Sequence, residues 1–151
     1  MKDKQLSVSA IKEGTVIDHI PASALFKVVS ILNLDTLDTM ITIGNGLESS
    51  KLGHKGIIKL SKVFFKDYEI NKIALVAPCA KLNIIKDYDV VEKRVVEIPD
   101  EIISIVKCVN PKCITNNEEV VTRFEVISKS DLKLKCHYCE KITDQDNIEI
   151  I

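Results

Sequence analysis

Four cysteines near the end of the chain constrain its fold more than any other feature: Cys108, Cys113, Cys136 and Cys139. Four residues separate the first pair, two separate the second, and 22 lie between the pairs. Two close pairs on tight turns, joined by an insert of hairpin length, are typical of a zinc site in which four thiolates complete a tetrahedron. The spacing therefore predicts one structural Zn2+ per chain, with no open coordination position for catalysis.

Two disulfides, or four unrelated thiols, are the alternatives. Disulfides require an oxidising compartment, and the start MKDKQ leads into no signal-peptide core, so we expect a reduced, cytoplasmic protein. His137 lies between two ligands of an already complete set and is expected at the surface or in support of the ligands. Cys79 follows Pro78 in an apolar stretch, and we expect it to be a small buried side chain.

Length and charge narrow the function classes. The 151 residues allow one medium domain or two small ones, and the apolar runs are far shorter than a membrane span. The formal net charge is −1, divided into +2 over residues 1–97 and −3 over residues 98–151. Because nucleic-acid binding needs a basic face, the acidic second part argues against nucleic acid as a partner.

Hydrophobic periodicity predicts an α+β domain over residues 1–97. The expected strands are residues 6–11, 16–20, 39–43, 57–60, 81–85 and 89–92. The expected helices are residues 22–33, with one apolar side, and residues 67–74, with Asp67 as N-cap and Tyr68 on the buried side. Residues 47–56 are expected to be a loop. This βαββαβ order describes a ferredoxin-like sandwich, an antiparallel sheet with two helices on one face.

The stretch at residues 97–100 predicts a boundary, followed by a zinc-binding domain over residues 98–151. Residues 120–127 and 132–136 are expected to form a hairpin that delivers the second cysteine pair, and residues 148–151 a terminal strand. The second domain is therefore expected to be all-β and zinc-ribbon-like.

The sequence contains no recognisable catalytic motif. It has no G-x-S-x-G, no glycine-rich phosphate loop and no H-E-x-x-H. Asp18 and His19 are adjacent in a predicted strand, so their side chains are expected on opposite faces and unable to act together. We therefore expect a non-catalytic protein.

Several stretches match one family in order and spacing. They are GTVIDHIPA at residues 14–22, ITIG at 41–44, KGIIK at 55–59, AP at 77–78, YDVV at 88–91 and LKCHYCE at 134–140, with the first cysteine pair before the last. Together they closely resemble the regulatory chain of aspartate carbamoyltransferase, over essentially the whole chain. The resemblance implies a non-catalytic subunit of that enzyme of pyrimidine biosynthesis.

The resemblance also implies partners and effectors. The N-terminal domain would bind nucleotides and pair with a second regulatory chain, and the zinc domain would dock on catalytic chains, so that three regulatory dimers link two catalytic trimers. CTP would inhibit, ATP would activate, and UTP would cooperate with CTP. The implied nucleotide site consists of Val8, Ala10, Ile11, Asp18, His19, Lys59, Asn83, Ile85, Tyr88, Val90 and Lys93.

These residue types suit a nucleotide. Lys59 and Lys93 are point charges for a triphosphate, Asp18 can accept hydrogen bonds from ribose hydroxyls, and Val90 offers an apolar wall to the base. Glu92 precedes Lys93, where a small residue would leave the phosphates freer, so its carboxylate is expected to oppose a triphosphate. The rival interpretation is a free-standing zinc-ribbon module that binds nucleic acid or transcription machinery, and an enzyme comes third.

Overall fold

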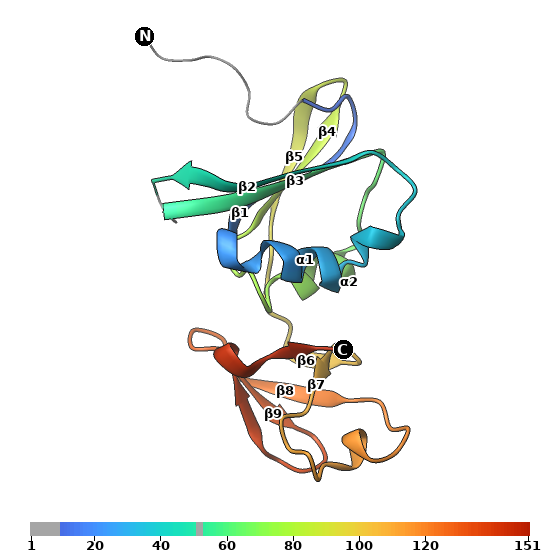
Figure 1. Cartoon of the computed structure of the whole chain (residues 1–151), viewed down its shortest axis with the longest axis vertical. Coiled ribbons are helices and arrows are strands. Elements are labelled where there is room, and N and C mark those ends of the chain that lie inside the picture. The colour runs from blue at the N-terminus through green and yellow to red at the C-terminus, as the bar shows by residue number, and fades with distance from the viewer. Residues whose placement is uncertain (1–9, 51–52) are drawn as a thin grey trace. The chain divides into compact units, whose positions relative to one another are not determined.

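The computed structural model describes residues 10–50 and 53–151 (Figure 1). The chain divides into two compact units, which we call unit 1 (Met1–Glu97) and unit 2 (Ile98–Ile151). No helix in the described ranges is both long and apolar enough to cross a membrane.

Unit 1 is an antiparallel five-stranded sheet with helices on one face. Its strands are β1 (Gly14–Pro21), β2 (Ile41–Ser49), β3 (Gly53–Ser61), β4 (Lys81–Lys86) and β5 (Asp89–Val95). They lie in the order β2-β3-β1-β4-β5. Figure 1 shows α1 (Leu25–Ile31) and α2 (Asp67–Ile73) on the same side of this sheet. The predicted α+β, ferredoxin-like class is confirmed, and β5 adds a strand at one edge.

The core of unit 1 lies between the sheet and the helices. Ile17 on β1 is directly opposite Ile58 on β3 and Leu82 on β4, and all three side chains are fully buried. From α1, Leu25 and Val28 are equally buried. Burial of these branched aliphatic side chains supplies most of the stabilisation of such a layer.

Two helical details differ from the prediction. α1 is shorter than residues 22–33, because a 3₁₀ turn at Ala22–Ala24 precedes it and Asn33, with φ of 53°, ends the helical run. In α2, Asp67 is the first helical residue rather than the N-cap, which is Lys66. The Lys66 N–H donates to Glu69 Oε1 at 3.2 Å, which satisfies one of the free donors at the helix start. Tyr68 is 63% exposed, so its expected burial is wrong.

The predicted loop at residues 47–56 is also wrong. β2 continues to Ser49 and β3 begins at Gly53, so the two strands form a long hairpin. The register shifts between Gly44 and Leu47, and Gly46 adopts φ of 75°. The glycines that suggest a strand end therefore form a bulge within the strand, which glycine permits at little cost.

Unit 2 is all-β, as predicted. Its strands are β6 (Glu101–Ile103), β7 (Val106–Lys107), β8 (Arg123–Ser128), β9 (Lys133–Cys136), β10 (Ile142–Asp144) and β11 (Glu149–Ile150). β10, β9, β8 and β6 form one antiparallel sheet in that order, and β11 pairs with β7. The predicted hairpin is β8–β9, and the buried Phe124, Ile102 and Leu134 form a small core beside the cysteines.

Candidate functional sites

One row of side chains crosses the sheet of unit 1 on a single face. Lys59 on β3 is opposite Val16 on β1, Val16 is opposite Asn83 on β4, and Asn83 is opposite Lys93 on β5. Directly opposed residues of antiparallel strands project to the same face. The register therefore brings three of the predicted nucleotide-site residues, Lys59, Asn83 and Lys93, onto one face, which we call the polar row together with Val16.

The polar row lies on the face away from the helices. Val16 is followed by Ile17, whose side chain is buried in the core with Ile58 and Leu82. Because successive side chains of a strand alternate between faces, Val16 and its row point to the other side. Within the described residues no helix covers that side of the sheet (Figure 1).

A second, apolar row lies beside the polar one. Ile85 on β4 is opposite Val90 on β5, on the same face as Asn83 and Lys93. The two strands are joined by the turn residues Asp87 and Tyr88, with φ of 50° and 69°. Positive φ at both positions is the pattern of a type I′ turn, which suits a two-residue hairpin.

The hairpin turn lies against the start of the described chain. The Tyr88 N–H donates to the Lys12 carbonyl oxygen at 2.9 Å, which holds the exposed Tyr88 beside the segment that contains Ala10 and Ile11. Val8, also predicted for the site, lies outside the described residues. Of the residues predicted to contact the base, the structure thus places Ala10, Ile11, Ile85, Tyr88 and Val90 around the β4–β5 turn.

Asp18 and His19 do not lie on opposite faces as expected. A bulge interrupts β1 between Ile17 and Ile20, and His19 adopts φ of 59°. Asp18 Oδ1 accepts the His19 N–H at 2.6 Å, and Asp18 Oδ2 lies 3.6 Å from His19 Nδ1. The bulge re-aims one side chain, so the two act as neighbours, and the rule of alternation fails here.

Lys55 is a member of this cluster that the sequence analysis did not identify. Its Nζ lies 2.9 Å from Asp18 Oδ1. Burial raises the pKa of Asp18, but the hydrogen bonds from Lys55 and from the His19 N–H outweigh it, so the pKa lies below its ordinary value. Asp18 is therefore a carboxylate at neutral pH. The only sequence signal for Lys55 is its place at the start of the KGIIK stretch.

Lys59 lies near the same carboxylate. Partial burial lowers the pKa of Lys59, and the charge of Asp18 acts in the opposite direction. Partial burial also strengthens the attraction between Lys59 and a nearby anion, because the local dielectric is lower than that of water.

Glu92 does not face Lys93. It is opposite Ile84, a residue that alternates with Asn83 and therefore projects to the helix-side face. There its Oε1 lies 3.8 Å from Arg94 Nε, and Arg94 in turn forms an ion pair with Asp67 at the start of α2. Because the strand separates the two side chains, we now expect Glu92 to oppose an anion at Lys93 only weakly.

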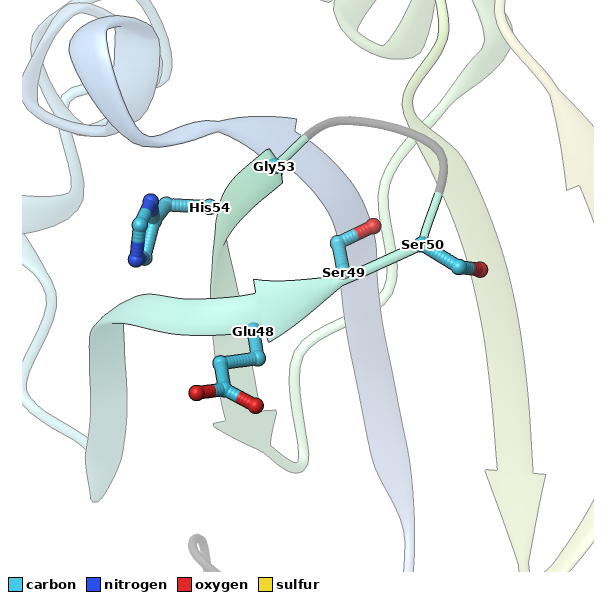
Figure 2. A pocket seen from close by; sticks show the side chains of 5 residues that line it. All are labelled: Glu48, Ser49, Ser50, Gly53 and His54. Carbon is cyan, nitrogen blue, oxygen red and sulfur yellow. The ribbon is translucent and has the colours of Figure 1, made fainter.

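Two surface hollows lie apart from the polar row. The first is at the end of the β2–β3 hairpin, where Figure 2 shows Glu48 and His54 on neighbouring strands together with Ser49, Ser50 and Gly53. The second is in unit 2 and is lined in part by Ser104, Thr122 and Ile151. None of the predicted nucleotide-site residues lines either hollow.

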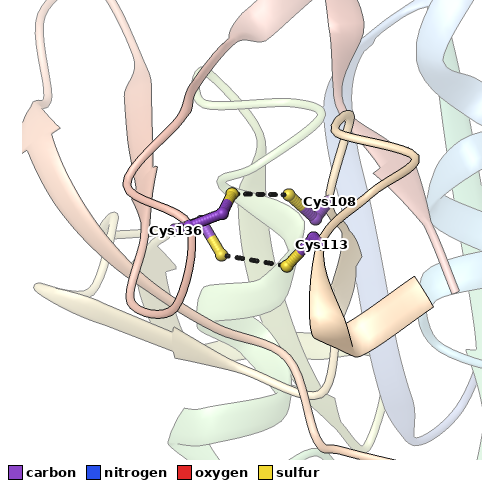
Figure 3. A group of neighbouring side chains, drawn as sticks. Cys108, Cys113 and Cys136 are labelled. Carbon is purple, nitrogen blue, oxygen red and sulfur yellow. Dashed lines mark hydrogen bonds between the residues drawn. The ribbon is translucent and has the colours of Figure 1, made fainter. Parts of the chain in front are cut away.

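The four cysteines of unit 2 converge in space. Figure 3 shows the sulfurs of Cys108, Cys113 and Cys136 turned toward one another. All four sulfurs lie within 4.8 Å of each other, with 3.6 Å between Cys108 and Cys139 and 3.7 Å between Cys113 and Cys136. A tetrahedral zinc with Zn–S bonds of about 2.3 Å requires edges of about 3.8 Å. The cluster fits a metal ion such as zinc, whereas a disulfide needs about 2.0 Å.

The local chain explains this convergence. Cys108 follows β7, and Cys113 precedes a 3₁₀ turn at Ile114–Asn116. The second pair begins at the last residue of β9, and the chain turns back at Glu140 with φ of 62°, where the Cys136 N–H donates to the Lys141 carbonyl. His137 is exposed and packs edge-on to Tyr138 at 5.1 Å, outside the cluster.

The thiols differ in acidity. Burial raises the pKa of Cys108 to about 12. Burial also raises the pKa of Cys139, but hydrogen bonds from the Lys141 N–H, the Asn110 side chain and the neighbouring thiols together outweigh it and lower the pKa to about 7. Four neighbouring thiolates repel one another unless a cation lies between them. Metal binding is therefore coupled to the release of protons from the buried cysteine thiols. Cys79, in contrast, is exposed, so its expected burial is wrong.

Comparison with known proteins decides the family. Residues 6–97 match the family model "Aspartate carbamoyltransferase regulatory chain, allosteric domain", and residues 100–149 match the "metal binding domain" of the same chain. The chain belongs to this family. The protein named aspartate carbamoyltransferase regulatory chain in Bacteroides fragilis is 60% identical over 146 residues, which cover 97% of this chain and 95% of that protein. That of Thermococcus sibiricus is 54% identical over 96% of both chains.

Family membership settles the general role. The chain is a regulatory, non-catalytic subunit with an allosteric domain and a metal-binding domain, and its partner is the catalytic chain of aspartate carbamoyltransferase. The predicted regulatory family is confirmed. The comparisons do not favour the rival free-standing zinc-ribbon module.

Proposed function

We propose that unit 1 binds nucleoside triphosphate effectors on the sheet face that carries the polar row. CTP and ATP are the principal effectors, with UTP as a third. The observation that carries the proposal is the register, which puts Lys59, Asn83 and Lys93 in one line across four strands. Two lysines and an amide on one helix-free face suit an anionic ligand, because lysine binds phosphate as a point charge.

The face offers separate surfaces to the parts of a nucleotide. Lys59 and Lys93 are three strand spacings apart, about 14 Å between backbones, so flexible lysine stems can converge on phosphates between them. Asp18, held by Lys55, accepts hydrogen bonds from ribose hydroxyls, and His19 donates to a phosphate or hydroxyl. The Ile85–Val90 row, with Tyr88 and the backbone of Ala10 and Ile11, receives the base.

Effector binding would bias the catalytic chains through the regulatory subunit. In this proposal CTP inhibits and ATP activates, with a coupling free energy of roughly 1–3 kcal/mol. Regulatory chains pair as homodimers, and three such dimers link two catalytic trimers in the cytoplasm.

The metal in unit 2 is, in this proposal, one zinc ion per chain with a structural role. Four thiolates fill its coordination sphere, so they leave no position for water or substrate. Zinc then fixes the shape of the surface of unit 2 that docks on the catalytic chain. The required state of the cysteines is reduced, in agreement with their sulfur separations.

Calorimetric titration of CTP into the full chain tests the nucleotide site. Lys59→Ala and Lys93→Ala should each raise the CTP dissociation constant about 10- to 100-fold, since a hydrogen bond to a charged group contributes roughly 1.5–3 kcal/mol. Lys27→Ala is the matched control, because it removes the same charge from an exposed position on α1. Equal CTP affinity in the unchanged chain and all three variants would contradict the proposed nucleotide site. An equal loss of affinity in the Lys27→Ala control would contradict it too.

A further inference from the structure

The first cysteine pair encloses a longer loop than the second, and the backbone carbonyls of that loop need partners. We call residues 108–113 the first knuckle. Its four-residue spacer is longer than the two-residue spacer of the second pair. Backbone N–H groups bond the oxygens of Asn110 and Cys113, each at 3.0 Å. Unpaired carbonyls beside buried cysteines would be costly and would leave the loop free to take several shapes.

Two consecutive side chains bond four carbonyls of this loop, two of which, those of Asn110 and Cys113, also accept backbone N–H groups. Asn116 Nδ2 donates to the oxygens of Cys108 at 2.9 Å and Asn110 at 2.8 Å. Asn117 Nδ2 donates to the oxygens of Pro111 at 3.0 Å and Cys113 at 2.8 Å. A carboxamide has two N–H donors, so both amides use their full donor capacity on the first knuckle.

The residue before them acts on the same loop. Thr115 Oγ1 donates to Cys113 Sγ at 3.2 Å. Inside the loop, the Asn110 N–H points to the Cys108 thiol while its carbonyl is held by Asn116. Asn116 thus holds the carbonyl of the same residue whose N–H reaches a ligand sulfur.

The second knuckle does not use this device. Residues 136–139 are closed by backbone bonds such as Glu140 N–H to the Cys136 oxygen at 3.0 Å, and the Asn110 side chain bonds the Cys139 thiol rather than a carbonyl. The two halves of the cluster are thus shaped in different ways.

We propose that Asn116 and Asn117 are positioning residues for the metal, which hold the first knuckle in its ligating shape before the ion arrives. The inference requires that the cluster binds a metal, but it is independent of the nucleotide site. Groups that orient metal ligands typically change metal affinity 10- to 100-fold when they are removed.

The test is zinc affinity of the full chain, measured by competition with a chromogenic chelator. Asn116→Ala and Asn117→Ala should each raise the zinc dissociation constant at least tenfold and speed zinc loss to excess chelator. With Co2+ in place of zinc, the thiolate-to-metal absorption should keep its position, because all four sulfurs remain. Asn147→Ala is the matched control: it is in unit 2, and its amide donates to Asp144 Oδ1 rather than to the first knuckle.

Dissociation constants within twofold of the unchanged chain in both variants would overturn the proposal, as would an equal loss in the control. A readout that needs no variant is exchange of the side-chain NH2 protons in the zinc-loaded chain. Those of Asn116 and Asn117 should exchange more slowly than those of Asn147, and equal exchange would also overturn it. If the unchanged chain itself shows no four-thiolate Co2+ spectrum, the metal site proposed above fails instead.

Discussion

The two units solve the problem of a stable core in different ways. In unit 1, the buried aliphatic side chains of the sheet and both helices form a continuous core, with Ile17, Leu60 and Ile73 fully buried. Unit 2 is little more than half as long, and its buried set is small, with Phe124 as the largest member. A domain of that size buries too little apolar surface to be stably folded by its core alone, and it commonly requires a metal ion or disulfides.

The difference extends to the relation between site and core. In unit 1 Lys59 and Lys93 of the polar row lie on the face away from the core, so we expect them to change at little cost to packing. In unit 2 three ligands, Cys108, Cys113 and Cys136, are themselves buried. The comparison indicates that the lysines proposed to bind phosphate in unit 1 are separable from its stability, whereas the cysteines of unit 2 are not.

Metal removal should have the largest effect and should be confined to unit 2. Complete zinc removal, or Cys136→Ser, should unfold residues 98–151, because structural zinc contributes roughly 10–16 kcal/mol in small zinc domains. In an amide NMR spectrum, the signals of unit 2 should collapse while those of unit 1 stay. Well-dispersed signals from unit 2 in a chain shown to be free of metal would contradict the claim that only unit 2 depends on the metal for its fold.

A core truncation should do the reverse. Ile17→Ala should lower the free energy of unfolding of unit 1 by about 2–5 kcal/mol, because it leaves a cavity between β1 and its neighbours and Ile17 is fully buried. Thermal unfolding followed by NMR should show no change in unit 2. The control is Val91→Ala at an exposed position, and a loss as large there would mean that core burial is not the cause.

Asp18→Asn should produce a smaller, pH-dependent loss in unit 1. The folded pKa of Asp18 lies below its ordinary value of 3.8, so its ion pair stabilises the fold above that value and the contribution disappears as pH falls through the folded pKa. Denaturant titrations should give a difference of about 1 kcal/mol at pH 7, shrinking below about pH 4. A difference that instead grows on acidification would contradict the assigned ion pair.

Glu92→Gln should have the smallest effect on effector binding. Because Glu92 lies on the helix-side face with Arg94, its charge should change the CTP dissociation constant less than twofold in a calorimetric titration. A tenfold gain in affinity would show that its carboxylate reaches the polar face after all.

Periodicity and cysteine spacing were enough to predict the strand–helix order and the metal cluster, because both depend on local patterns. Alternation also implies that Lys59, Asn83 and Lys93 could share a face, but only the pairing register shows that they do. The family resemblance, rather than any local pattern, selected those residues.

The errors come from non-local or irregular backbone. The bulge at His19 and that at Gly44–Leu47 depend on partner strands, so alternation alone misplaces His19 and ends β2 too early. Cys79 and Tyr68 are apolar or aromatic residues at the surface, and hydrophobicity alone does not tell which ones remain exposed. Lys55 was missed because ion pairs between strands leave no mark in the sequence.

The central claim is that a metal-supported unit 2 joins this chain to catalytic chains. Sedimentation velocity of the zinc-loaded chain, mixed with catalytic trimers of aspartate carbamoyltransferase from the same source, tests it most directly. The account predicts one large complex that separates into trimers and regulatory chains when a chelator removes the zinc. Unmixed species before chelation, or a complex that survives complete removal of zinc, would contradict it.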